Sequence, residues 1–394
     1  MTTSLARKWR HNIAVAAKRL RRRKRSIAKR ASARASSLAF RRHLKDPRTG
    51  LAPRRLYAPR VFSALNRRMR PALLNFLSLL RDSVLRDRRR IHIDFSKTER
   101  MISDGTLLFY AELYRLTRMA GSARMISCNY PSDNVVEQVL QQIGVFRLLG
   151  KRERAKIDHD LVKHWNSATG TKVEGKAIEP VELFYQGTMA SELTASTLYN
   201  GIIEAMSNCS HHAYPSGVSY KAAHSRVSST TAGADNTAAI HSEDDKVDSR
   251  WWMFSQCREG ILTVVFCDLG IGVPASVRGG AKWKKSVVTA LLSHLGLAES
   301  DGALIRAAFE LGKSQTGEAH RGKGFQNIQQ VLDAQGQGNL RVLSGHGHYE
   351  YTPATDDWPK QQLIQNHAQG SRGTLIFWSL PIKSGLDNGK HDDN

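Results

Sequence analysis

The sequence predicts an α/β protein in which two folded units follow a cationic N-terminal arm. In residues 91–150, strand-like alternation and amphipathic helical spacing take turns, in the order β-α-β-α. In residues 181–384, a largely apolar strand at 261–267 lies between helical segments and runs into a glycine-rich turn. Residues 1–90 hold 28 Lys and Arg but only three acidic side chains. These observations predict the order of arm, small unit and large unit.

The N-terminal arm carries almost all of the excess positive charge. The 394 residues contain 59 Lys and Arg against 35 Asp and Glu, whereas residues 91–394 alone hold 31 and 32. Seven cationic side chains crowd into residues 18–25, where like charges repel and oppose compact folding. Because such runs release counterions from polyphosphate, residues 1–90 are expected to bind nucleic acid or another polyanion. Three other interpretations stay open: an organelle transit peptide, a solvated tail, or contact with an anionic membrane surface.

Cysteine usage and hydropathy indicate a cytoplasmic protein without a transmembrane segment. The four cysteines stand far apart and form no C-x-x-C pair, which argues against a thiolate zinc site or a disulfide framework. The longest apolar stretches, 73–80 and 261–267, are much shorter than a membrane span. The fifteen histidines include no H-E-x-x-H pair, so core or solvated histidines are expected rather than metal ligands.

Residues 91–150 are expected to form a small α/β domain. Three prolines end the arm, and a short apolar helix at 72–81 leads into the domain. Two strands, each followed by an amphipathic helix, are predicted at 91–95 and 124–130, with helices at 103–119 and 135–149. This order predicts a parallel sheet with helical cover. Polar residues 151–180 are expected to be a linker, and residues 385–394 a disordered tail.

The pattern of this small domain resembles the STAS-type domain of bacterial anti-sigma-factor antagonists. The resemblance covers about 60 residues and rests on the order of strands and helices. Those antagonists carry an Asp-Ser-Ser-Gly phosphorylation site, whereas this chain has Ser103-Asp104-Gly105-Thr106 at that place. Neither Ser103 nor Thr106 is therefore expected to accept phosphate. We expect a structural domain, or one that docks a protein partner.

The large unit contains four segments, in a fixed order, whose residues suit nucleotide chemistry. The first is a helix at 198–209, in which Glu204 and Asn208 are four residues apart and share one face. An amide oxygen can ligate a hard cation such as Mg²⁺, and a nearby carboxylate can take a proton from water. Such a pair is also common on ordinary helix surfaces, so it gains meaning only with the other three segments.

The second segment joins the strand at 261–267 to a turn with the pattern Asp268-x-Gly270-x-Gly272. A carboxylate at the end of a strand offers an acceptor for an exocyclic amine, and the glycines allow a ligand to approach the backbone closely. The pattern differs from the dinucleotide fingerprint G-x-G-x-x-G and from the G-x-x-x-x-G-K-[ST] phosphate loop.

The third segment, 317–328, is a glycine-flanked turn that opens a helix. Its cationic side chains and glycines are Arg321, Gly322, Lys323 and Gly324. Free backbone N–H groups at a helix N-terminus, beside two cationic side chains, predict an anion pocket. A plain basic turn is the alternative.

The fourth segment, 371–381, is a late strand that Gly373 and Thr374 open. A hydroxyl at that point could reach a ring nitrogen of a bound base, directly or through water.

Together, the four segments resemble the GHKL, or Bergerat-fold, ATP-binding domain of type II topoisomerases, histidine kinases and anti-sigma-factor kinases. The resemblance covers about 200 residues. The four motifs match its N-box (Glu204, Asn208), adenine box (Asp268, Gly270, Gly272), phosphate-lid box (Gly322, Gly324) and last strand motif (Gly373, Thr374). It implies an α/β sandwich, with a mixed, mostly antiparallel sheet, helices on one face, and ATP between the helices and a lid.

The resemblance also implies a role for each matched residue. Asp268 would accept a hydrogen bond from the adenine amine, assisted by Thr374, and Asn208 would hold Mg²⁺ at the phosphates. Lys323, with Arg321 and the glycine amides, would bind the β- and γ-phosphates, and Glu204 would be the general base of hydrolysis. Residues 215–250 form an insertion, and 275–320 a long lid with helical patches at 287–297 and 303–311. Lids of this family often help to form homodimers.

The sequence therefore predicts an ATP-binding and ATP-hydrolysing protein that couples Mg-ATP to a conformational or partner-binding switch, with a basic arm on nucleic acid. Two alternatives keep the nucleotide: an anti-sigma-like serine/threonine protein kinase, and a scaffold that binds ATP without hydrolysing it. A histidine autokinase is disfavoured because no dimerisation helix with a phosphoacceptor histidine precedes the domain.

Overall fold

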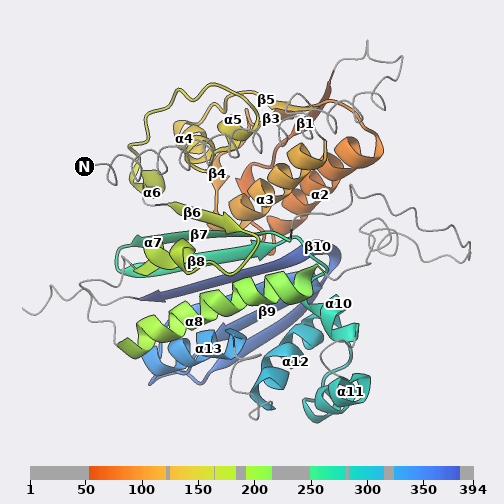
Figure 1. Cartoon of the computed structure of the whole chain (residues 1–394), viewed down its shortest axis with the longest axis vertical. Coiled ribbons are helices and arrows are strands. Elements are labelled where there is room, and N and C mark those ends of the chain that lie inside the picture. Colours follow the sequence, from red (N-terminus) through yellow and green to blue (C-terminus); the bar gives the residue numbers. More distant parts are fainter. Residues whose placement is uncertain are drawn as a thin grey trace, which may run out of the picture.

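A computed structural model describes residues 53–120, 125–163, 165–182, 192–214, 249–279, 284–314 and 324–381. Within them the chain is a mixed α/β protein, which confirms the predicted fold class at that level. Two larger sheets lie one above the other, with a first unit built on a three-stranded sheet and a second on a five-stranded one (Figure 1). Residues 1–52 of the arm expected at 1–90 lie outside the described residues, as do residues 382–394 with the expected tail at 385–394.

The three-stranded sheet of the first unit is parallel, as predicted. Its strands are β1 (Arg54–Tyr57), β3 (Ile91–Asp94) and β5 (Ile126–Cys128), with β3 in the middle. A small parallel pair, β2 (Val61–Phe62) and β4 (Arg100–Met101), lies beside it. Because β1 pairs with β3, residues 54–90 belong to this unit, which corrects the expected boundary at 91.

The helices of the first unit follow the apolar spacing of the sequence. They are α2 (Arg70–Arg81), the π-helix η1 (Asp82–Arg86), α3 (Ser103–Met119), α4 (Asn134–Gln142), α5 (Val145–Leu148) and α6 (Asp160–Lys163). The expected helix at 135–149 is divided into α4 and α5 because Gly144 adopts a left-handed conformation with φ of 83°. The predicted helix at 103–119 is confirmed with the same bounds.

The five-stranded sheet of the second unit has the order β6-β7-β8-β10-β9, with every neighbouring pair antiparallel. Its strands are β6 (Asn166–Gly170), β7 (Trp251–Arg258), β8 (Ile261–Asp268), β9 (Asn339–Thr352) and β10 (Gln361–Pro381). Since β6 is an edge strand of this sheet, much of the segment expected to be a linker at 151–180 is built into the fold.

Helices of the second unit cover one face of its sheet. They are the 3₁₀ helix η3 (Gly175–Ile178), α7 (Glu179–Glu182), α8 (Glu192–Asn208), the π-helix η4 (Cys209–Ala213), α10 (Val273–Arg278), α11 (Lys285–His294), α12 (Asp301–Ser314) and α13 (Gly324–Gln335). In Figure 1, α8 and α13 lie side by side on this face. Ile202 and Met206 of α8 are buried there against Phe266 and Trp378 of the sheet.

The first unit covers the opposite face of the same sheet. Trp252, Phe254, Val265, Cys267, Leu269, Leu343 and Leu375 share one continuous core with the apolar residues of α2 and α3. The Tyr114 ring of α3, for example, meets the Trp252 ring edge-on at 5.9 Å. Burial on both faces explains why the middle of β8 is apolar without interruption.

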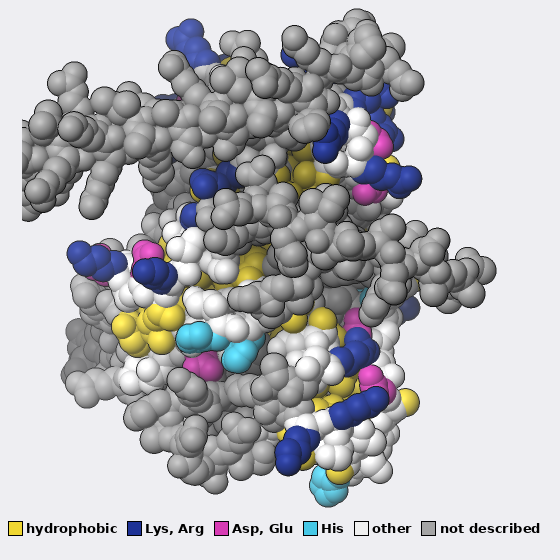
Figure 2. All heavy atoms as spheres, turned by 45° about the vertical axis from the view of Figure 1, so that its right-hand side comes forward, with side chains coloured by type: hydrophobic (Ala, Val, Ile, Leu, Met, Phe, Trp, Pro, Cys, Tyr) yellow, Lys and Arg dark blue, Asp and Glu magenta, His cyan; other side chains and the backbone are white. Residues whose placement is uncertain are grey.

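Charge is distributed unevenly over the described surface. In the upper part of Figure 2, which the first unit forms, Lys and Arg outnumber acidic side chains among the residues drawn in colour. In the lower part, where Figure 1 has α10 to α12, basic and acidic side chains alternate. In α10, Arg278 pairs with both Glu299 at 3.1 Å and Asp301 at 2.8 Å.

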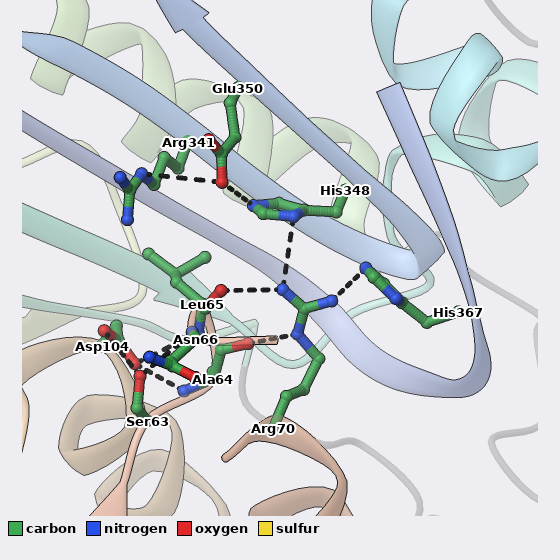
Figure 3. Close-up of polar contacts among 10 residues, drawn as sticks. All are labelled: Ser63, Ala64, Leu65, Asn66, Arg70, Asp104, Arg341, His348, Glu350 and His367. Carbon is green, nitrogen blue, oxygen red and sulfur yellow. Dashed lines mark hydrogen bonds and ion pairs between the residues drawn. The ribbon is translucent and has the colours of Figure 1, made fainter. Parts of the chain in front are cut away.

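A buried arginine joins the two units (Figure 3). Arg70, at the start of α2, donates to the carbonyl oxygens of Ala64 at 2.5 Å and Leu65 at 2.9 Å. The same guanidinium contacts His348 Nδ1 of β9 at 3.2 Å and the ring of His367 in β10. Burial and the nearby Arg70 charge lower the pKa of His348 to about 3. His348 is therefore neutral and accepts from the arginine.

The segment Ser103-Asp104-Gly105-Thr106 serves the packing of the first unit. The buried Asp104 carboxylate accepts a hydrogen bond from Ala64 N at 2.5 Å, and so fixes the loop that leads to Arg70. Gly105 leaves no room for a side chain, since a Cβ there would lie 2.5 Å from the Phe62 carbonyl carbon. Thr106 is fully buried. These contacts give the segment a structural role.

Candidate functional site

The centre of the candidate site is Asp268, the last residue of β8. Residues 262, 264 and 266 of β8 point to the α8 face, so the alternation of a strand puts Asp268 on that face too. The carboxylate is 6% exposed, and its Oδ1 accepts a hydrogen bond from Gly270 N at 2.8 Å. Thr374 lies directly opposite Asp268 on β10 and also hydrogen-bonds to it.

The environment of Asp268 changes its acidity. Burial raises the pKa of Asp268 to about 6, although the hydrogen bonds from Gly270 and Thr374 favour the ionised form. A buried acceptor of this kind is expensive to keep ionised. A further hydrogen-bond donor close to Asp268 would therefore stabilise its ionised form.

The glycines of the turn allow protein segments to touch. A Cβ on Gly270 would lie 2.1 Å from the carbonyl oxygen of Ala213, which accepts from Ile271 N at 2.8 Å. Gly373 has φ of 67°, and a Cβ on it would lie 2.0 Å from the Asp268 carbonyl oxygen. Gly272 has φ of 79° and is close to Ser344 Oγ. The sequence predicts that Gly270 and Gly272 leave space for a ligand, but protein atoms occupy that space at both positions.

Ser344 of β9 is a site residue that sequence reasoning missed. Its fully buried hydroxyl accepts from Val273 N at 2.9 Å, donates to the Gly373 carbonyl oxygen at 2.8 Å, and lies 3.3 Å from Thr374 Oγ1. It therefore fixes the start of α10, β9 and β10 to one another. The available signal was a single small polar residue directly after Val342 and Leu343.

Glu204 and Asn208 both lie on α8, as the spacing predicts. Both side chains are half-buried. α8 continues into η4, where the Ala213 carbonyl oxygen accepts from Ile271 N at 2.8 Å and lies against Gly270, two residues after Asp268. The structure thus connects the end of α8 to the turn that follows Asp268.

The phosphate-lid motif is described only in part. Arg321, Gly322 and Lys323 lie outside the described residues, whereas Gly324 is the first residue of α13. Since α13 packs along α8, the helix that Gly324 begins belongs to the same layer as Glu204 and Asn208. The insertion expected at 215–250 also lies outside the described residues, apart from its last two positions.

The expected lid at 275–320 is partly a fixed element. Its second helix, α12, is packed into the core, where Phe309 meets the Tyr349 ring of β9 at 4.8 Å. Asp301 anchors the start of α12, since it accepts from His346 N at 2.7 Å and pairs with Arg278 at 2.8 Å. The helical patches predicted at 287–297 and 303–311 are confirmed as α11 and α12, each beginning two residues earlier.

Comparisons with protein-family models, curated proteins and solved structures find no match to this chain. Among the described residues, no three His, Cys, Asp or Glu side chains gather in a way that could hold a metal ion. None of the described helices combines the length and hydropathy that crossing a bilayer requires.

Proposed function

We propose that residues 166–381 form a GHKL-type ATP-binding unit, and that Mg-ATP bound there drives a conformational or partner-binding switch. The observation that supports this most strongly is the buried carboxylate of Asp268, which shares one face of the sheet with Thr374 and with α8. The order of the described elements around the five-stranded sheet agrees with the sandwich that the motifs imply.

Adenine recognition would rest on Asp268 and Thr374. A carboxylate has about four lone-pair positions, and Gly270 and Thr374 leave acceptor capacity for the exocyclic amine. A donor from the base would stabilise the ionised form of the carboxylate in its buried place. The hydroxyl of Thr374, close to Ser344, can turn toward a ring nitrogen.

The phosphates and the metal would lie toward α8 and α13. Mg²⁺ keeps several waters and is bound through one or two protein oxygens plus substrate phosphates, so the single amide oxygen of Asn208 fits it. The free N–H groups at the start of α13, with Arg321 and Lys323 in the preceding segment, would take the negative charge. The bound nucleotide supplies a transferable phosphoryl group.

Hydrolysis would depend on Glu204. The carboxylate lies one helical turn before Asn208, on the same side of α8, and is partly open to solvent. From there it can take a proton from a water that attacks the terminal phosphate. Glu204 is thus the general base of the proposed activity.

Calorimetric titration with ATP, with and without Mg²⁺, tests the proposal directly. Asp268→Asn replaces part of the acceptor by a donor and should weaken ATP binding by about 1–3 kcal/mol, as expected for one buried partner left unsatisfied. Asp357→Asn, in the exposed turn between β9 and β10, is the matched control and should bind ATP like the wild type. Equal ATP affinity of the wild type and Asp268→Asn would refute the adenine assignment.

A further inference from the structure

Among the described residues, one face of the three-stranded sheet in the first unit is polar and partly open to solvent: its two outer strands carry exposed side chains, whereas on the central strand His92 is half-buried and Asp94 is buried. Leu56, Ile93 and Cys128 point into the core, and the residues between them point the other way. We define the outer sheet face by Arg55, Tyr57, His92, Asp94 and Ser127, which the parallel register aligns in two rows. Parallel sheets usually have both faces covered, so an open polar face here calls for an explanation.

The polar groups of the outer sheet face leave its positive charge available to bind a ligand. Asp94 is its only acid, and its Oδ1 accepts from Asn129 Nδ2 at 2.9 Å and from Ser96 N at 2.9 Å. Arg55 pairs with Asp94 only at 3.6 Å, and its side chain is 60% exposed. The Asp94 side chain is only 8% exposed and keeps its hydrogen bonds to Asn129 and Ser96, so the exposed Arg55 guanidinium, at the long distance of 3.6 Å, can exchange partners at low cost.

Further cations frame the outer sheet face at both ends of its strands. At the carboxyl end, Lys151 Nζ donates to the Cys128 carbonyl oxygen at 2.9 Å, and its charge is one of those that lower the pKa of His92. At the amino end, the exposed residues 88–90 are three consecutive arginines. A hydrogen bond of 2.9 Å from Arg54 N to the Arg90 carbonyl oxygen keeps them beside β1.

An exposed aromatic ring completes this surface. Tyr57 belongs to the edge strand β1 and is 62% exposed, whereas most large apolar side chains of the first unit are buried. A sheet face that presents an aromatic ring among cations offers a base a surface to stack on and offers its backbone phosphates partners. Stacking requires an unpaired base, which a duplex does not present.

We propose that the outer sheet face binds single-stranded nucleic acid, with Tyr57 stacked on a base and Arg55, Lys151 and the arginines at 88–90 on backbone phosphates. The complementary charge of a polyphosphate chain is the argument for this occupant. The site is separate from the nucleotide site, which faces α8 on the other sheet. It adds a base-contacting surface to the charge of the arm, and it does not depend on ATP binding.

Fluorescence anisotropy of the full chain tests the proposal, with labelled oligo(U) and oligo(dT) of about 20 nucleotides and a duplex of the same length. Tyr57→Ala should weaken single-strand binding by roughly 5- to 150-fold, the equivalent of 1–3 kcal/mol per stacked base. Duplex binding should not change, because the arm and the other cations remain. Tyr57→Phe keeps the ring and should bind like the wild type.

Trp358→Ala is the matched control, since Trp358 is 67% exposed in the second unit, and it should leave binding unchanged. In a salt series, Arg55→Gln should reduce the slope of log affinity by roughly 0.7. Unchanged single-strand binding by Tyr57→Ala would overturn the proposal, as would an equal loss for single strand and duplex. Phosphatidylserine vesicles serve as a third probe. If Tyr57→Ala weakens binding to the vesicles but not to the oligonucleotides, the outer sheet face binds a membrane instead.

Discussion

Replacing Asp268 by Asn should remove the pH dependence that this carboxylate gives to the free energy of unfolding, while it weakens ATP binding. The wild-type carboxylate is buried, and burial raises its pKa from 3.8 to about 6. An acid with a raised pKa in the folded state binds more protons folded than unfolded between these two values. Its contribution to stability is therefore complete below about pH 4 and is lost as the pH rises through about 6.

The size of this loss follows from the shift in pKa. A change of about two units, at 1.36 kcal/mol for each, gives about 3 kcal/mol. Asn cannot ionise, and its amide oxygen can still accept from Gly270 N. The free energy of unfolding of Asp268→Asn, relative to the wild type, should therefore increase by about 3 kcal/mol between about pH 3 and about pH 7.5, with about 2 kcal/mol of that increase above pH 4.5.

Urea unfolding followed by tryptophan fluorescence, at several pH values, measures this difference. Asp94→Asn is a control of opposite sign, because hydrogen bonds from Ser96 lower the pKa of Asp94. The stability that Asp94 contributes is lost as the pH falls, so its variant should differ most from the wild type at high pH and be the less stable protein there. A constant difference between wild type and Asp268→Asn at every pH would refute the reasoning about burial.

Two further predictions concern α8 and the contact between the units. Glu204→Gln should retain ATP affinity but lower the steady-state rate of phosphate release by about 10²–10⁴, and a wild-type rate would exclude Glu204 as the base. Arg70→Met should lower the free energy of unfolding by about 2–5 kcal/mol, since it leaves the buried carbonyl groups of Ala64 and Leu65 without their donor. The matched control is Arg68→Met, at an exposed position two residues earlier, which should change the urea midpoint little. Equal midpoints for the two arginine variants would contradict the second prediction.

Periodicity predicted the elements whose own side chains fill the core. The helix at 103–119 and the strand beginning at 261 are examples, since each buries an apolar face over its length. The short edge strands were not predicted, because pairing with a neighbouring strand fixes their conformation and their own sequences carry no clear alternation. β1 has the sequence RRLY and β6 the sequence NSATG, and neither alternates clearly. As a result, the expected boundary at 91 and the expected linker at 151–180 were misplaced.

The candidate site was predictable in its residue types and less so in its construction. Asp268 and Thr374 meet because β8 and β10 are neighbours in the sheet, a pairing between residues more than a hundred positions apart. Ser344 was missed because its importance lies in hydrogen bonds to Val273 and Gly373 that arise only after folding. The glycines were recognised, but the atoms that exclude a side chain come from Ala213 and other distant segments.

The packing behind the turn at 268–272 decides where the proposed switch could move. Leu269, next to Asp268, is fully buried in the core that the two units share, and its carbonyl oxygen accepts from Arg372 Nε at 2.9 Å. The turn is thereby fixed from behind by the first unit and from the side by Ser344. α11 is attached to the rest of the unit by few buried side chains, chiefly Val288 and Leu292. Because a weakly packed helix costs less free energy to displace than a core turn, the proposed switch would displace α11 more readily than the turn.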